Sequence, residues 1–250
     1  MILKNYSITL PSYSIGDNVY SKIGEICEPY GKKVICIGGK TAISKVRDLI
    51  INECNGTSLE ILDFLWYGGD ATYENVNTLK ENELVKKADI IFGIGGGKAL
   101  DTAKALAYIT NKEIFTFPTI ASNCAGTTAV SIMYNADGSF KEPFFFTAPA
   151  RHCFIYTPVI AKSPAKYMWA GIGDTYAKYF EAEMSSRGED LVHYHALGVT
   201  TSQMCLTPLL KYGKKALDDF KSGTASFEVE QVVLGIVVTT GIASILLTNE

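Results

Sequence analysis

Short apolar runs alternate with amphipathic stretches through the first part of the chain. The runs that are suited to buried strands are residues 34–37, 61–66, 90–92 and 114–117. The stretches between them, such as 42–54 and 73–87, carry apolar residues at helical spacing. Buried strands separated by helices predict a mostly parallel sheet that is covered on both faces and connected by right-handed crossovers.

The pattern changes after residue 130. Residues 131–134 and 144–146 flank a turn segment, Asn135 to Gly138, and predict a hairpin. Residues 153–156 form the last strand that the pattern supports. Ser163 and Pro164 predict a helix start, with the serine as cap and the proline in the first turn. Helices are expected from there to the end of the chain.

We therefore predict an α/β domain over residues 1–160 and an all-helical domain over residues 161–250. Asn249 and Glu250 follow directly on an apolar helix without a polar tail, so that either the protein ends on a buried helix or the chain is a fragment. Residues 232–247 carry no charge but number 16, fewer than the roughly 20 that span a bilayer. We expect them to form a buried helix.

Composition excludes some classes of protein. A hydrophobic content of 47%, a charged content of 20% and a net charge of -3 are typical of a soluble globular protein without a nucleic-acid or membrane partner. The N-terminus lacks the apolar core of a signal peptide. The six cysteines form no C-x-x-C pair, which favours reduced thiols in the cytoplasm.

A glycine-rich turn, Gly93 to Lys98, follows a predicted strand and opens a predicted helix. Glycines allow the backbone to approach a phosphate closely, and the helix N-terminus supplies N–H groups and partial positive charge. Lys98 adds a full charge. In the helix that follows, an apolar face is expected opposite a polar one; the polar face comprises Lys98, Asp101, Thr102 and Lys104.

Neither common phosphate-binding spacing fits this turn. A P-loop would need a glycine in place of Phe92 and a hydroxyl in place of Ala99. The G-x-G-x-x-G spacing of Rossmann folds fails because residue 98 is lysine. A purely structural turn remains the alternative, but a strand–turn–helix context favours phosphate binding.

The segment from Phe92 to Lys104 resembles the cofactor signature of glycerol dehydrogenases, in the superfamily of iron-type alcohol dehydrogenases and dehydroquinate synthase. Residues 118–122, residues 170–182 and the surroundings of Tyr212 resemble the family in the same order. The similarity covers essentially the whole chain. It implies a dinucleotide-binding α/β domain and a truncated helical domain.

The resemblance assigns roles by position. Gly95, Gly96, Gly97 and Lys98 would hold the pyrophosphate of NAD or NADP. Other matching positions would contact the cofactor, two of them near its nicotinamide half (Thr119 and Ser122) and three elsewhere (Thr128, Val130 and Tyr134). Asp174 matches the first ligand of a catalytic divalent metal, zinc or iron. A metal ion bound there would polarise the substrate hydroxyl before hydride transfer.

Three departures from the family pattern stand out. None of His152, His193 and His195 matches a histidine metal ligand, and His152 is expected to be solvated. Cys124 stands where glycerol dehydrogenases carry an aspartate that holds the polyol, which puts glycerol in doubt as the substrate. Gly38 replaces an acidic residue that is frequent in the family, so that with Lys40 nearby NADPH is expected to be tolerated or preferred.

The leading hypothesis is a metal-dependent NAD(P) oxidoreductase, with a small polyol or hydroxy-ketone as substrate, that assembles as a homo-oligomer. A glycerol-1-phosphate dehydrogenase-like enzyme is an alternative, with phosphate-binding candidates in Lys162, Lys166 and Arg151. A dehydroquinate synthase-like lyase is a less favoured alternative. A non-catalytic nucleotide-binding remnant is the alternative from another class of protein.

Overall fold

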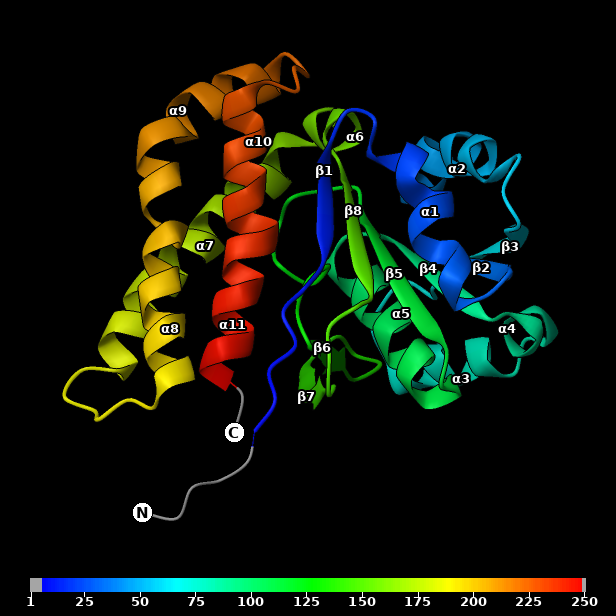
Figure 1. The fold of residues 1–250 in the computed structure, drawn as a ribbon, viewed down its shortest axis with the longest axis horizontal. Helices are drawn as coiled ribbons and strands as arrows, with labels where there is room; N and C mark the ends of the chain where they lie inside the picture. Colours follow the sequence, from blue (N-terminus) through cyan, green and yellow to red (C-terminus); the bar gives the residue numbers. More distant parts are fainter. Residues whose placement is uncertain (1–5, 249–250) are drawn as a thin grey trace.

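The computed structural model describes residues 6–248, and a sheet of six strands forms its centre (Figure 1). The strands of this sheet are β1 (Tyr13–Gly16), β2 (Lys33–Gly38), β3 (Glu60–Trp66), β4 (Ile90–Gly95), β5 (Glu113–Pro118) and β8 (His152–Tyr156). Their order is β1-β8-β5-β4-β2-β3, and every neighbouring pair is parallel. The predicted parallel sheet is confirmed.

Helices cover both faces of this sheet, as the apolar runs predict. One face packs on α1 (Ile23–Cys27) and α2 (Lys40–Cys54). The other packs on α3 (Tyr73–Lys80), α4 (Glu83–Lys87) and α5 (Gly97–Thr110). Strands β2 and β4 are buried nearly throughout because they lie between these two layers.

The predicted hairpin is present, as β6 (Val130–Tyr134) paired antiparallel with β7 (Phe140–Phe145). It packs on α5 and makes that helix more buried than its sequence suggests. Asp101, Thr102 and Lys104 are all nearly inaccessible, so only Lys98 of the expected polar face is accessible to solvent. The expectation of an ordinary polar face on α5 is wrong because two layers enclose the helix.

Strand β1 was not anticipated from the apolar pattern, and it changes the environment of His152. The imidazole is buried between two hydroxyl groups of the β1 segment, with Ser12 Oγ at 2.7 Å from Nδ1 and Ser14 Oγ at 3.0 Å from Nε2. Burial, together with the charge of Lys22, lowers the pKa of His152 to about 4. The expectation that His152 is solvated is therefore wrong.

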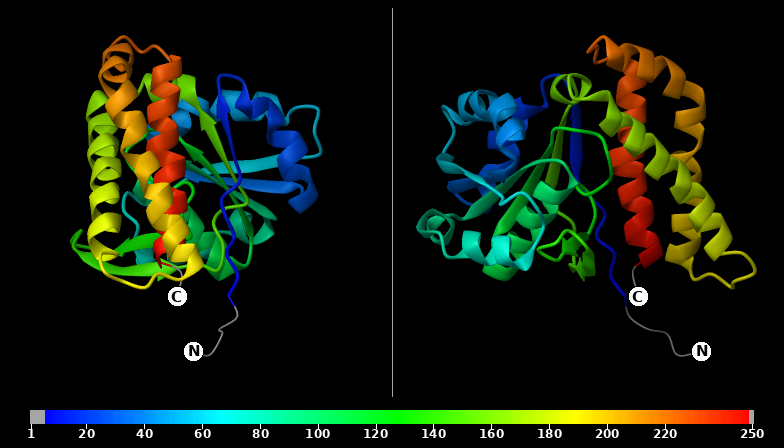
Figure 2. Two further views of the ribbon diagram at one scale, coloured as in Figure 1. Left: turned by 60° about the vertical axis from the view of Figure 1, so that its left-hand side comes forward. Right: turned by 180° about the vertical axis from the view of Figure 1, so that it is seen from behind.

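After β8 the described chain is helical, as expected, and these helices lie beside the β1 edge of the sheet (Figures 1 and 2). They are α6 (Thr157–Ala161), α7 (Ala165–Ser185), α8 (His193–Ser202), α9 (Thr207–Lys221), α10 (Phe227–Leu234), a π-helical segment (Gly235–Thr239) and α11 (Thr240–Thr248). Short 3-10 helices span Val19–Lys22, Glu28–Tyr30 and Gln203–Cys205. Ser163 does not cap α7: Pro164 is the N-cap residue, and the Ser163 hydroxyl has no partner.

The last three helical segments run on as one helix from Phe227 to Thr248, 22 residues long. Its length, and the mean hydropathy of 2.0 of its most apolar 18 residues, would suit a membrane span, so the expectation of a 16-residue segment that is too short is wrong. However, 61% of its most apolar stretch is buried against the rest of the protein, which fits a core helix. The expectation of a buried helix is confirmed.

Candidate functional site

A cavity of about 680 Å³ lies where the carboxyl end of β4 faces α7 and α11. We call it the main cavity. Its lining includes most of the predicted site residues, namely Gly95, Gly96, Gly97, Lys98, Ser122, Cys124, Thr128, Val130, Tyr134 and Asp174. Ligands of parallel α/β sheets bind at this edge, because the loops that leave the strands open there.

The glycine turn forms one end of the main cavity. Gly95 ends β4 with a φ of +143°, Gly96 is the N-cap residue of α5 and Gly97 is its first residue. A Cβ on Gly96 would collide with Ile120, and one on Gly97 would collide with the amide of Asn123. The turn is therefore a bare backbone cradle at a helix N-terminus, which fits a pyrophosphate group.

Lys98 stands beside this cradle and is already paired. Its Nζ lies 2.6 Å from Asp70 Oδ2 and 4.7 Å from the centre of the Tyr134 ring. The side chain of Lys98 is 46% exposed and that of Asp70 is 27% exposed. An ion pair this accessible to solvent is weak, so a phosphate can compete for the ammonium group.

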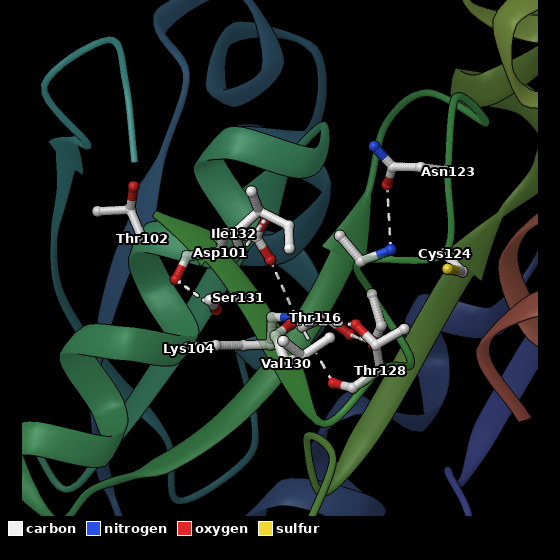
Figure 3. Close-up of polar contacts among 12 residues, drawn as sticks. Asp101, Thr102, Lys104, Thr116, Asn123, Cys124, Thr128, Val130, Ser131 and Ile132 are labelled. Atoms are coloured by element: carbon white, nitrogen blue, oxygen red, sulfur yellow. Dashed lines mark hydrogen bonds and ion pairs between the residues drawn. The ribbon is translucent and has the colours of Figure 1, made fainter. Parts of the chain in front are cut away.

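A buried ion pair on α5 joins Asp101, which lines the main cavity, to Lys104, which does not (Figure 3). Lys104 Nζ is 3.0 Å from Asp101 Oδ1, an ion contact without hydrogen-bond alignment, and 3.1 Å from the hydroxyl of Thr128. The same ammonium group donates to the carbonyl of Val130. Thr128 and Val130 are thus positioned by Lys104, through a contact that the sequence did not reveal.

The loop after β5 closes one side of the main cavity. Its first residue, Thr119, donates its backbone N–H to the carbonyl of Gly95 at 3.1 Å. Farther along, Asn123 Oδ1 accepts a hydrogen bond from the backbone N–H of Ala125 at 3.0 Å, and Cys124 lies between them (Figure 3). Thr119 itself does not line the main cavity. It lines a second cavity of about 550 Å³, which also includes Lys45 and Lys162.

The main cavity is also lined by Cys124 and by Asp174 and Lys178 of α7, whose charges influence one another. Burial, together with the carboxylate of Asp174, raises the pKa of the Cys124 thiol to about 12, against the opposing effect of Lys104 and Lys178. Cys124 is therefore a neutral thiol at physiological pH. Burial also raises the pKa of Asp174, against the opposing effect of Lys178.

The described residues do not complete a metal site. Nowhere in residues 6–248 do three or more His, Cys, Asp or Glu side chains form a group that could hold a metal ion. His193 and His195 belong to α8 and do not line the main cavity. Asp174 can supply one ligand, whereas a catalytic zinc site usually has three from protein.

The basic residues considered for a substrate phosphate are not brought together. Lys162 lines the second cavity, and Lys166 lines neither cavity. Arg151 is paired with Glu113 at the start of β5, at the amino end of the strands, with 2.5 Å between Nε and Oε2. The expectation that all three lie near the cleft is wrong.

The structure leaves no room at Gly38 for the acidic side chain that the family often carries at this position. Gly38 ends β2, and a Cβ there would collide with the carbonyl oxygen of Ile94. An acidic side chain cannot occupy this position without a backbone shift. Lys40 Nζ lies 4.6 Å from the centre of the Trp66 ring, close to the same strand end. The acceptance of NADPH stays a prediction.

Sequence reasoning did not single out several residues that line the main cavity, among them Tyr67, Asn123, Tyr167, Lys178 and Thr240. For Lys178 a signal was present, because residues four apart on a helix share a face and Asp174 was already a candidate. Thr240 and Tyr167 come from distant helices, and nothing local marks them.

Comparison with known proteins places the chain in a family. The sequence profile described as iron-containing alcohol dehydrogenase matches residues 11–153, more than half of the chain. The chain belongs to the iron-containing alcohol dehydrogenase family. Within that family it is 27% identical to the glycerol dehydrogenase of Escherichia coli over 225 residues, which cover 88% of this chain and 61% of that protein.

Two further comparisons agree with this result. The glycerol dehydrogenase of Thermotoga maritima is 34% identical over 171 residues, covering 67% of this chain and 47% of that protein. The crystal structure of glycerol dehydrogenase from Schizosaccharomyces pombe superposes with a TM-score of 0.86 at 24% identity, covering 96% of this chain and 62% of the other. This superposition supports the fold. The chain spans about three fifths of the length of the E. coli relative.

Proposed function

We propose that this chain carries the cofactor and substrate site of a metal-dependent oxidoreductase. In the proposed reaction a hydride passes between NAD(P) and a small polyol or hydroxy-ketone. The observation that supports this most directly is the main cavity, which is lined both by a bare glycine cradle and by a carboxylate, Asp174. The glycerol dehydrogenases among its relatives support the same class of reaction.

The cofactor is assigned to the glycine end. The backbone of Gly95, Gly96 and Gly97 would bind the pyrophosphate, and Lys98 would exchange Asp70 for a phosphate oxygen. Further contacts to the dinucleotide are assigned to Thr119, Ser122, Thr128, Val130 and Tyr134. The nicotinamide ring supplies or accepts the hydride, and the residues around it orient the ring and exclude water.

The substrate is assigned to the end that holds Cys124 and Asp174. Asp174 is proposed as one ligand of a divalent zinc or iron ion, although the described residues do not complete its coordination. The neutral thiol of Cys124 is a weak hydrogen-bond partner for a hydroxyl group, which argues against glycerol itself. We further propose that the protein acts in the cytoplasm as a homo-oligomer, with its α/β domain over residues 1–160 and a helical domain over 161–250.

Cofactor binding and turnover can be measured separately. Titration of the chain with NADH and with NADPH, followed by nicotinamide fluorescence, is expected to show saturable binding of at least one of them. Reduction of hydroxyacetone in the presence of Zn²⁺ or Fe²⁺ is then followed by NAD(P)H absorbance. Asp174→Asn is expected to lower turnover at least about a hundredfold with cofactor affinity retained, because the carboxylate lies at the substrate end.

The outcomes separate the proposal from its alternative. Saturable cofactor binding without turnover of any hydroxy-ketone, polyol or 2-oxo acid would favour the non-catalytic remnant. Absence of binding to both cofactors would overturn the proposal as a whole.

A further inference from the structure

Two lysine side chains line the main cavity, and their settings differ. Lys98 stands at the glycine end, against Asp70. Lys178 stands at the substrate end, on the face of α7 that also carries Asp174 one turn earlier. The only ion-pair partner of Lys178 among the described residues is Glu181, at 2.6 Å between Nζ and Oε2.

This pair leaves Lys178 available to a ligand. The side chain of Glu181 is 60% exposed, whereas that of Lys178 is 28% exposed. An ion pair with so exposed a partner contributes little, since water screens it. Burial acts to lower the pKa of Lys178, but Glu181, Cys124 and Asp174 together hold it above its ordinary value. The ammonium group is therefore charged and partly desolvated, and Lys178 lines the cavity.

The other charges around the main cavity are matched locally. Asp101 has Lys104 behind the cavity wall, and Lys98 has Asp70. Cys124 adds no charge. Among the described residues the substrate end thus carries one carboxylate, Asp174, and one ammonium group, Lys178. A neutral polyol would give this ammonium group no counter-charge, whereas a substrate with an anionic group would.

We propose that Lys178 binds the carboxylate of the substrate, and that the substrate is a small 2-oxo acid or the matching 2-hydroxy acid. This inference rests on the proposed function and narrows its substrate class. The neutral Cys124 is part of the same specificity, because an aspartate at that position would repel the incoming carboxylate. With the carboxylate on Lys178, the adjacent carbonyl carbon stays at the Asp174 end of the cavity.

The chemistry of reduction leaves the carboxylate unchanged. NAD(P)H transfers a hydride to the C2 carbonyl carbon of the 2-oxo acid, and the carbonyl oxygen takes up a proton that derives from solvent. The products are the 2-hydroxy acid and NAD(P)⁺. Lys178 binds and orients the acid but exchanges no electrons with it.

A matched pair of substrates tests this directly. Pyruvate and hydroxyacetone share a three-carbon ketone skeleton, but only pyruvate carries a carboxylate next to the carbonyl group. We expect kcat/KM for pyruvate to exceed that for hydroxyacetone at least about tenfold, the value of one charge-assisted hydrogen bond. Dihydroxyacetone phosphate serves as a third substrate. A preference for it over pyruvate would assign the anion to a phosphate and overturn the carboxylate proposal.

Variants distinguish an anion receptor from a helix-stabilising lysine. Lys178→Met is expected to lower the ratio of kcat/KM for pyruvate to that for hydroxyacetone at least about tenfold. Glu181→Gln removes the competing carboxylate and is expected to raise this ratio. If Lys178 serves only to pair with Glu181, both variants will change the ratio alike. Lys221→Met is the matched control, since Lys221 pairs with Asp218 at i,i+3 on α9, outside the main cavity; it should leave the ratio unchanged.

A binding measurement keeps the inference separate from the proposed function. Oxamate, an unreactive analogue of pyruvate, is titrated calorimetrically into the chain in the presence of NADH and Zn²⁺. We expect Lys178→Met to weaken oxamate binding at least about tenfold. Equal affinity in wild type and variant, or no oxamate binding to wild type, overturns the inference. Oxamate binding that depends on Lys178 but occurs without NADH binding would count against the proposed function alone.

Discussion

Each half of the molecule presents a helix to the main cavity, and each of these helices carries an ion pair at i,i+3. On α5 the pair Asp101–Lys104 is almost fully buried, whereas on α7 only Lys178 of the pair Lys178–Glu181 is partly buried and Glu181 is exposed. Lys104 of the first pair donates hydrogen bonds to Thr128 and Val130, and so fixes the position of two residues that line the main cavity. The second leaves its lysine at the cavity surface. The same sequence spacing thus gives a structural element in one half and a candidate binding group in the other.

The difference has a simple physical origin. The hairpin of β6 and β7 covers α5 on the side away from the sheet, so charged groups on that side must find partners inside the protein. No comparable layer covers the outer face of α7, where Trp169, Tyr176 and Phe180 are exposed in the structure. The burial of an ion pair, more than its spacing in the sequence, therefore decides whether it stabilises the fold or leaves a charge available to a ligand.

Breaking the buried pair should have the largest effect. Lys104→Met leaves the Asp101 carboxylate unpaired inside the protein, and we expect a loss of about 3 to 5 kcal/mol in the free energy of unfolding. Lys178→Met should cost less than about 1 kcal/mol, because its partner Glu181 is exposed. Urea denaturation measures both. The double variant Asp101→Asn with Lys104→Met should be more stable than Lys104→Met alone, and a further loss would contradict this account of the pair.

Acid should weaken the α/β half through His152. Its pKa is about 4 in the folded protein and near its ordinary 6.5 when unfolded, so the unfolded state binds more protons between these values. Stability is then full above pH 6.5 and falls as the pH drops to about 4, by about 3 kcal/mol at most. His152→Gln should reduce this dependence when stability is measured by denaturation at several pH values. An equally steep dependence in the variant would assign it to other groups.

Filling the glycine cradle should weaken cofactor binding with little effect on folding. In Gly97→Ala the new Cβ meets the amide of Asn123 and occupies space that the pyrophosphate would approach. We expect NADH to bind at least about tenfold more weakly. Gly213→Ala is the control, because a Cβ in the middle of α9 would meet nothing within 4 Å. Equal loss of binding in both variants would show a general effect on the fold.

Removal of single helix caps should have the smallest effect on stability, and it tests whether the two halves unfold together. Thr72 caps α3 in the α/β half, and Ser226 caps α10 in the helical half, each accepting a backbone hydrogen bond at 3.2 to 3.3 Å. Substitution of either by alanine should cost about 1 kcal/mol. If the halves form one cooperative unit, both variants will shift a single thermal transition. Two separate transitions, each sensitive to one variant, would show that they unfold independently.

Local patterns in the sequence predicted much of the sheet and the position of the glycine turn. The strands around Phe92 and Phe115 are continuous apolar runs, which only a doubly covered sheet accommodates. Strand β1 escaped notice because its four residues, Tyr13–Gly16, are short and half-exposed at the sheet edge. The misjudged burial of His152 follows from that one omission.

The candidate site was predictable where one segment builds it and obscure where several segments meet. The cradle lies within a single strand–turn–helix unit, and Asp174 was found through family resemblance. The partners of Lys104 lie 24 and 26 residues away, so its role depends on a hairpin whose packing the sequence does not state. The role of Lys178 could be recognised only from the structure, because it depends on which face of α7 lines the main cavity.

The π-helical segment Gly235–Thr239 connects the two halves in one further way. Its wider turns leave backbone carbonyl groups open to other donors. The Thr127 hydroxyl donates to the carbonyl oxygen of Val237, and the Thr240 hydroxyl donates to the carbonyl oxygen of Gly235. The helix therefore holds one residue more than a regular α-helix of the same path would. Deletion of that residue would rotate all that follows by about 100°, turning Thr240 and Ser244 from the cavity. The length of this segment, rather than its composition, sets which side chains the last helix contributes.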